Sequence, residues 1–132
     1  MITRRGTLAG GLALILSAIS GAARAASWVV LGTRTVDLLG DHDEIEVGAD
    51  EGLYKAVRLH VEGNGILIDV VRVRFGNGNE LKFELRNFIG EGSSTRVLDF
   101  PGKARVLKRV ILNYAREPGG GQSVVTVQGL KA

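Results

Sequence analysis

Apolar and polar residues alternate along most of the chain that follows residue 27. In segment 81–86, Leu81, Phe83 and Leu85 are apolar, and the residues between them are charged. The same period of two recurs in segments 57–62, 71–75, 110–114 and 125–128. A period of two is typical of β-strands with one buried face and one exposed face. The pattern therefore predicts an antiparallel, all-β fold.

Turn signals divide this pattern into separate strands. Asn-Gly dipeptides at 64–65 and 77–78 supply the positive φ angles that two-residue hairpin turns require. We therefore expect residues 54–86 to form a three-stranded antiparallel meander. Residues 66–68 are all apolar, which indicates a central strand with a bulge near Asp69.

The remaining segments complete a set of about eight strands. Further strands are expected at 28–36, 43–47, 95–100, 104–115 and 123–130. Nineteen glycines and two prolines agree with short strands and many tight turns. Strands at this spacing predict a single β-sandwich over residues 26–132, with either a jelly-roll-like or a meander topology.

The first 25 residues have the pattern of a cleaved signal peptide. A basic start precedes the apolar run 8–19, which is too short to span about 30 Å of hydrocarbon as a helix. Ala23 and Ala25 form a small-residue cleavage site, so we expect cleavage between Ala25 and Ala26. The mature chain is then expected to contain no membrane span.

The paired arginines of this segment also indicate the route of export. Arg4 and Arg5, followed by Leu8, resemble a twin-arginine signal, although Thr7 stands where such signals usually carry Phe. The general secretory route is the alternative. Either route predicts an exported bacterial protein that is periplasmic or secreted.

Removing the signal peptide changes the charge of the protein. The whole chain has 17 basic and 14 acidic residues, but Arg4, Arg5 and Arg24 belong to the signal. The remaining 17 − 3 = 14 basic residues balance the 14 acidic ones. A net charge of zero argues against a nucleic-acid partner, because such binding needs a basic surface. An acidic segment, 26–51, is expected to lie against the more basic remainder. The alternative is that the two parts face away from each other and form two different partner surfaces.

The chain lacks the residues that several kinds of reaction or metal site require. The chain has no Cys, which excludes disulfides, thiolate metal sites and a Cys nucleophile. It has two histidines, His42 and His60, and we expect His60 on the outer face of a strand. Ser93 and Ser94 are not in a Gly-x-Ser-x-Gly sequence and are interpreted as loop residues. A hydrolase that uses two carboxylates remains an alternative.

The densest group of acidic residues suggests a metal site. Its members, at alternating and adjacent positions, are Asp41, Asp43, Glu44 and Glu46. Oxygen ligands of this kind suit Ca²⁺, although the spacing is not that of an EF-hand loop. A Ca²⁺-dependent ligand-binding module is therefore one hypothesis, and no cofactor is expected otherwise. The alternative interpretation is a turn followed by an exposed strand.

Basic residues on alternating strand positions suggest a second kind of site. The group consists of Arg72, Arg74, Lys82, Arg86, Arg105 and Arg109. Such a surface suits an anionic glycan or a lipid headgroup. Cross-strand ion pairs with Glu62 and Glu84 are the alternative explanation. The aromatic residues considered for stacking on a sugar are Trp28, Tyr54 and Tyr114, and so small a set argues against a carbohydrate-binding module.

Several segments together resemble a known family. They are 28–37, 56–61, 73–78, 95–102 and 110–114. They are similar to a family of small exported bacterial proteins classed as a domain of unknown function. The resemblance implies an exported all-β domain and no particular activity. We expect a non-catalytic binding or accessory protein of the cell envelope, whose partner is an envelope protein or an anionic glycan or lipid.

Overall fold

The computed structural model describes residues 28–47 and 52–132, which form eight β-strands. The strands are β1 (Trp28–Asp37), β2 (His42–Glu46), β3 (Tyr54–Gly63), β4 (Ile66–Phe75), β5 (Glu80–Ile89), β6 (Leu98–Asp99), β7 (Leu107–Tyr114) and β8 (Gln122–Lys131). Their positions follow the alternating segments of the sequence, because each strand buries one row of apolar side chains.

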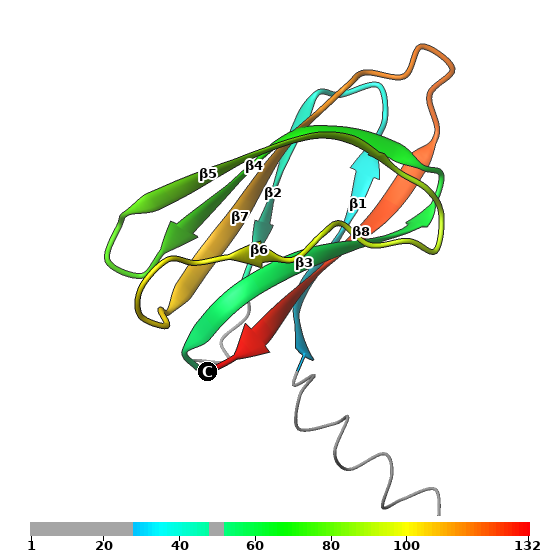
Figure 1. Ribbon diagram of the computed structural model, residues 1–132. Helices are drawn as coiled ribbons and strands as arrows, with labels where there is room; N and C mark the ends of the chain where they lie inside the picture. The colour runs from blue at the N-terminus through cyan, green and yellow to red at the C-terminus, as the bar shows by residue number, and fades with distance from the viewer. Residues whose placement is uncertain (1–27, 48–51) are drawn as a thin grey trace, which may run out of the picture.

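The strands form two antiparallel sheets of four that pack face to face (Figure 1). The first sheet has the order β1-β8-β3-β6 and the second has the order β2-β7-β4-β5. Successive strands thus alternate between the sheets except at the β4–β5 hairpin, an arrangement that matches a jelly roll. The prediction of an all-β sandwich is confirmed, and of the two expected topologies the jelly roll is observed.

The expected meander over residues 54–86 is wrong in its first half. β3 and β4 lie in different sheets, so Asn64 and Gly65 connect the two layers and do not form a hairpin. The positive φ angle of 79° falls on Gly63, and the N–H of Asn64 donates to the carbonyl of Gln122 on β8. The second hairpin, at Asn77-Gly78 between β4 and β5, is confirmed.

Two other strands are shorter than predicted. The strand expected at 95–100 is reduced to β6, which pairs with β3 over two residues, and Ser94 adds an isolated bridge to His60. The strand expected at 104–115 begins at Leu107. Arg105 precedes it and forms a separate bridge with Tyr54. Glycine, proline and exposed residues interrupt the pairing in this part of the chain.

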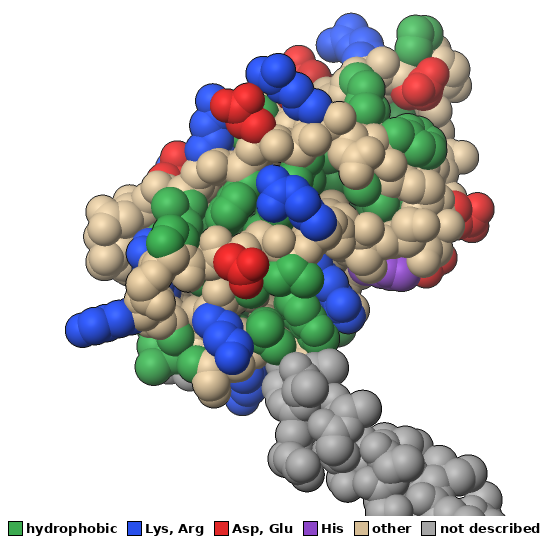
Figure 2. Space-filling view, in the orientation of Figure 1, with side chains coloured by type: hydrophobic (Ala, Val, Ile, Leu, Met, Phe, Trp, Pro, Cys, Tyr) green, Lys and Arg blue, Asp and Glu red, His purple; other side chains and the backbone are tan. Residues whose placement is uncertain are grey.

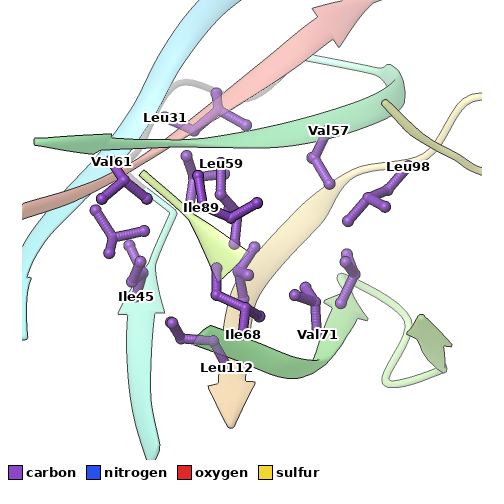
Figure 3. Close-up of a cluster of buried hydrophobic side chains, with 14 of the residues drawn as sticks. Leu31, Ile45, Val57, Leu59, Val61, Ile68, Val71, Ile89, Leu98 and Leu112 are labelled. Atoms are coloured by element: carbon purple, nitrogen blue, oxygen red, sulfur yellow. The ribbon is translucent and has the colours of Figure 1, made fainter. Parts of the chain in front are cut away.

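Apolar side chains from both sheets fill the space between the layers (Figure 3). Leu59 and Val61 of β3 point toward Ile68 of β4 and Leu112 of β7, and all four are fully shielded from solvent. The rings of Phe75 and Phe100 meet edge to face, with centroids 5.0 Å apart. Burial of such side chains contributes roughly 1.5–3 kcal/mol each to folding, which explains why the alternating pattern specifies the layers.

The bulge expected near Asp69 is confirmed. Ile68 and Val70 pair with adjacent residues of β7, so Asp69 is an extra residue on β4. On the other side of β4, two residues of β5, Leu85 and Arg86, lie opposite Asp69. Arg86 has a φ angle of 47°, the only positive value among the described residues other than glycine. The bulge thus reshapes one end of the second sheet.

The signal peptide, with its cleavage site between Ala25 and Ala26, lies outside the described residues. Within residues 28–47 and 52–132, no helix is long and apolar enough to cross a membrane.

Candidate functional site

A groove of about 630 Å³ lies at the bulged end of the second sheet. At this end β2 begins, β7 ends and β4 begins, because the strands are antiparallel. Its polar lining consists of Asp41, His42, Asp69, Arg86 and Asn113. The volume falls in the range of about 300–1,000 Å³ that is usual for ligand sites. Hereafter this feature is called the groove.

The apolar part of the groove is formed by Leu67, Tyr114 and Ala115. Leu67 alternates with the core residues Ile66 and Ile68, so its side chain lies on the outer face of β4 and is 43% exposed. Tyr114 also lines the groove but is only 4% exposed. The groove therefore combines an apolar surface with side chains that donate and accept hydrogen bonds.

The carboxylate of Asp41 is held by its neighbour. Nδ1 of His42 lies 3.0 Å from Oδ1 of Asp41. This hydrogen bond lowers the pKa of Asp41 below its usual value of 3.8. Asp41 is therefore ionised at neutral pH and offers the groove a hydrogen-bond acceptor.

The guanidinium of Arg86 is placed by an unusual backbone conformation. A positive φ at a residue with a side chain costs about 1–2 kcal/mol. Nη2 of Arg86 lies 3.1 Å from Oε1 of Glu84, and Nε lies 3.6 Å from Oδ1 of Asp69. The bulge thus brings a base and an acid together in the lining of the groove. Strained residues of this kind are often found at functional sites.

Asn113 presents its amide group to the groove. It pairs with His42 on β2 and with Val70 on β4, so it lies in the middle of the sheet. Its Oδ1 accepts a hydrogen bond of 2.9 Å from Nη1 of Arg72. The amide nitrogen makes no hydrogen bond within the described residues, and it can donate to a ligand.

The four acidic residues proposed as calcium ligands point in different directions. Asp43 turns inward, where Arg34 and the hydroxyl of Tyr114 donate to it. Glu44 and Glu46 lie on the outer face beside Arg109, at 3.0 and 3.5 Å. Among residues 28–47 and 52–132, no group of three or more His, Cys, Asp or Glu side chains is arranged to hold a metal. The Ca²⁺ hypothesis therefore remains a prediction without geometric support.

Five of the six residues of the predicted basic surface lie on the second sheet, mostly next to acidic partners. Arg74 bonds to Glu80 at 2.7 Å, and Lys82 lies 3.8 Å from Glu84. Arg86 and Arg109 have the partners described above, and Arg72 bonds to Asn113. Cross-strand ion pairs are therefore present, but with other acidic partners than the sequence suggested, namely Glu80 for Arg74 and Glu44 and Glu46 for Arg109. Of the two expected partners, Glu84 pairs with residues of its own strand, and Glu62 lies 2.7 Å from His60.

Arg105 does not belong to this surface. It lies in the connection before β7, where Nη2 donates to the carbonyl of Pro101 and the guanidinium covers the ring of Phe75 at 4.6 Å. On the face of the molecule drawn in Figure 2, basic, acidic and apolar side chains are interspersed.

The three aromatic residues that the sequence suggested for stacking on a sugar are buried or half-buried. Tyr54 and Tyr114 are buried, and Trp28 is half-buried beneath the guanidinium of Arg58, which lies 4.2 Å from its ring. Phe88 is instead 62% exposed and pairs with Leu67, which lines the groove. The alternation of β5 placed Phe88 on the outer face, and this was the signal that could have identified it.

A chain of hydrogen bonds on the first sheet was also missed. Nδ1 of His60 lies 2.9 Å from Oγ of Ser94, and Nε2 lies 2.7 Å from Oε2 of Glu62. The order of the groups, from serine through histidine to carboxylate, resembles that of a hydrolytic triad. The neighbouring N–H groups of Gly92, Ser93 and Thr95, however, donate to backbone carbonyls. These three groups are therefore not free to stabilise an oxyanion.

Comparison with solved structures supports the sandwich fold. The structure of AlgX from Pseudomonas aeruginosa matches 79% of this chain, with 15% identity and a TM-score of 0.50. This chain spans 26% of that chain. At this level of identity the match indicates the fold alone.

Two weaker matches have TM-scores below 0.5. A chain of infectious bursal disease virus Gx strain has a TM-score of 0.35 and 10% identity, over 80% of this chain and 31% of the viral chain. A family two carbohydrate esterase from Cellvibrio japonicus has a TM-score of 0.25 and 13% identity, over 76% and 33% of the two chains.

No curated protein sequence matches this chain. A family model described as a domain of unknown function, DUF2541, matches residues 10–129. The match covers almost the whole chain and confirms the resemblance found in the sequence to a family of unknown function. The chain belongs to the DUF2541 family.

Proposed function

We propose that this protein is a non-catalytic binding protein of the bacterial cell envelope, and that the groove is its ligand site. The observation that carries the proposal is the convergence of five polar side chains beside an apolar surface. They come from β2, β4, β5, β7 and the residue before β2, and a bulge with a strained Arg86 completes their arrangement. A concave site with a few convergent polar groups is the usual form of a small-ligand site.

The ionisation of Asp41 supports a role for this residue in binding. A hydrolase with two carboxylates needs one carboxyl group that stays protonated near neutral pH. Asp41 and Asp69 are the two carboxylates of the groove, and the pKa of Asp41 is lowered by its hydrogen bond to His42. Asp41 is therefore suited to accept hydrogen bonds and is not suited to act as a general acid.

The envelope location rests on the first 25 residues of the sequence. Expression of the full chain in a bacterium, followed by fractionation and mass spectrometry, tests it. The expected product is a periplasmic or secreted protein that begins at Ala26. Replacing Arg4 and Arg5 by Lys blocks export by the twin-arginine route, whereas a general secretory signal tolerates this change. An uncleaved product that remains in the cytoplasm contradicts the proposal.

The binding site is tested by NMR on the purified ¹⁵N-labelled protein. Saccharide, peptide and lipid fractions of a bacterial envelope are each added in turn. The expected result is that one fraction shifts the amide signals of Leu67, Asp69 and Asn113 and is recovered chemically unchanged. Shifts confined to the first sheet, or conversion of the ligand to a product, contradict the proposal.

A further inference from the structure

An exposed apolar platform adjoins the groove. Phe88 of β5 and Leu67 of β4 lie opposite each other on the outer face, and they are 62% and 43% exposed. Side chains at directly paired positions are in contact range. Leu67 also lines the groove, so the apolar surface continues from the aromatic ring to the polar side chains.

The ring of Phe88 is positioned by a glycine. A Cβ atom on Gly65 would lie 2.3 Å from Cζ and 2.9 Å from Cε2 of Phe88. The ring therefore packs directly on the backbone of Gly65, in space that a larger residue would occupy. One side of the ring is supported in this way, and the exposed remainder offers an apolar surface to a ligand.

The polar residues of the groove suit a ligand that both donates and accepts hydrogen bonds. Asp41 and Asp69 accept, whereas the guanidinium of Arg86 and the amide nitrogen of Asn113 donate. Each hydroxyl group of a sugar has one donor and two acceptor positions, and each sugar ring also has an apolar face of C–H groups. This combination matches the polar groove with its adjoining platform.

The charges of the groove disfavour an anionic ligand. Two carboxylates and one guanidinium line it, and a third carboxylate, that of Glu84, lies 3.1 Å from the same guanidinium. Two further arginines lie nearby. Arg72 donates to Asn113, and the charge of Arg116, after the hydrogen bond with His42, helps to lower the pKa of Asp41. The surroundings therefore hold no excess of positive charge. A carboxylate or phosphate on the ligand would have to displace Glu84 and Asp69 from Arg86. A neutral ligand can bind without displacing these carboxylates.

We propose that the groove and the Phe88–Leu67 platform bind a neutral saccharide, with a sugar ring stacked on Phe88 and its hydroxyl groups bonded to Asp69, Arg86 and Asn113. This inference rests on the proposed function, since it names the ligand class of the same groove. It replaces the anionic glycan that the basic residues of the sequence suggested.

The test is titration of the purified protein by NMR and calorimetry with saccharides of defined charge. The neutral probes are hexasaccharides of β-1,4-linked glucose and α-1,4-linked glucose, and a β-1,4-linked N-acetylglucosamine tetramer. A hexamer of galacturonate is the matched anionic probe. At least one neutral probe is expected to bind more tightly than the anionic probe and to shift the signals of Leu67 and Asn113.

Two pairs of variants assign the binding to the platform. Phe88→Ala is expected to weaken binding of the neutral probe about tenfold. Val30→Ala, at a residue of β1 that is 61% exposed, is its control and leaves the affinity unchanged. Gly65→Ala should weaken binding by displacing the ring, whereas Gly90→Ala, whose Cβ would lie 3.9 Å from that ring, should not.

The possible outcomes separate this inference from the proposed function. Tighter binding of galacturonate, or equal binding by Phe88→Ala and the unchanged protein, overturns the saccharide proposal. If none of the neutral probes binds but a peptide or lipid fraction shifts the groove signals, the saccharide proposal is wrong and the binding function stands. If no probe or fraction shifts them, both proposals are wrong.

Discussion

Arg34 of β1 and Asp43 of β2 form an ion pair between the two sheets, with Nε of Arg34 2.5 Å from Oδ1 of Asp43. The second oxygen of Asp43 accepts a hydrogen bond from the hydroxyl of Tyr114 on β7. One carboxylate thus joins an edge strand of the first sheet to two strands of the second, beside the groove.

Replacement of Asp43 by Asn is expected to destabilise the fold. The change removes the ion pair, but Arg34 is half exposed, so the expected loss is about 1 kcal/mol. Urea unfolding followed by tryptophan fluorescence measures it. Glu44→Gln is the control and should cost less, because the side chain of Glu44 is 47% exposed, against 15% for that of Asp43, and Arg109 keeps Glu46 as a second partner. Unfolding of Asp43→Asn at the same urea concentration as the unchanged protein would refute this role.

Tyr114 predicts a loss of stability at alkaline pH. Burial, followed by the neighbouring charge of Asp43, raises the pKa of Tyr114 from 10.0 to about 12. The unfolded chain therefore releases this proton at lower pH than the folded chain. The contribution of Tyr114 to stability is complete below pH 10 and declines as the pH rises toward about 12.

Urea unfolding at intervals between pH 9 and 12 measures this decline, with Tyr114→Phe as the comparison. Tyr114→Phe loses hydrogen bonds to Asp37 and Asp43, so it starts from a lower stability. Its stability should then fall less steeply above pH 10, because it has no phenol to ionise. Parallel curves for the two proteins would show that burial does not shift this group.

The positive φ angle of Arg86 predicts that its replacement by glycine does not destabilise the fold. Glycine adopts a φ of 47° without strain, so Arg86→Gly should be neutral or should stabilise the fold by up to about 1 kcal/mol. Lys82 lies on the same strand, has an acidic partner and has a negative φ. Lys82→Gly should therefore cost about 0.5–1 kcal/mol. Equal losses in thermal unfolding of the two variants would contradict the assigned strain.

The packing of the core predicts that replacing two different leucines by alanine destabilises the fold by very different amounts. Leu112 on β7 is completely buried between the sheets, whereas Leu39 in the β1–β2 connection is 52% exposed. Leu112→Ala should cost about 2–5 kcal/mol, since it leaves a cavity in a close-packed interior. Leu39→Ala should cost less than about 1 kcal/mol. Urea unfolding of both variants distinguishes them, and similar costs would be inconsistent with this packing.

Local sequence pattern was enough to place most strands and the bulge. The apolar run at residues 66–68 predicted a bulge near Asp69. The structure gives the physical reason, since Ile68 and Val71 both face the core although they are three positions apart. The Asn77-Gly78 hairpin was predictable for a similar reason, since its turn geometry depends on neighbouring residues alone. The acidic partners of the basic residues were only partly predictable, because a cross-strand partner can be identified only when the register between the two strands is known.

The pairing of β3 could not be predicted from its own residues. Asn64-Gly65 gives the same signal as Asn77-Gly78, and a strand with one buried face fits either sheet of a sandwich. The groove was missed because its lining comes from residues between Asp41 and Ala115 that only the jelly-roll topology brings together. Phe88 was missed because the meander was expected to end at residue 86, whereas β5 continues to Ile89.

The position of β8 has a consequence for how the chain reaches its native state. β8 ends at Lys131 and lies between β1 and β3, and it pairs with each of them along nearly its whole length. Among the described strands, β1 therefore has no partner in its sheet until the ten residues of β8 have been synthesised. The first sheet therefore cannot be completed before β8 has been synthesised, whereas the second sheet does not contain β8. The many long-range contacts of the fold predict slow folding.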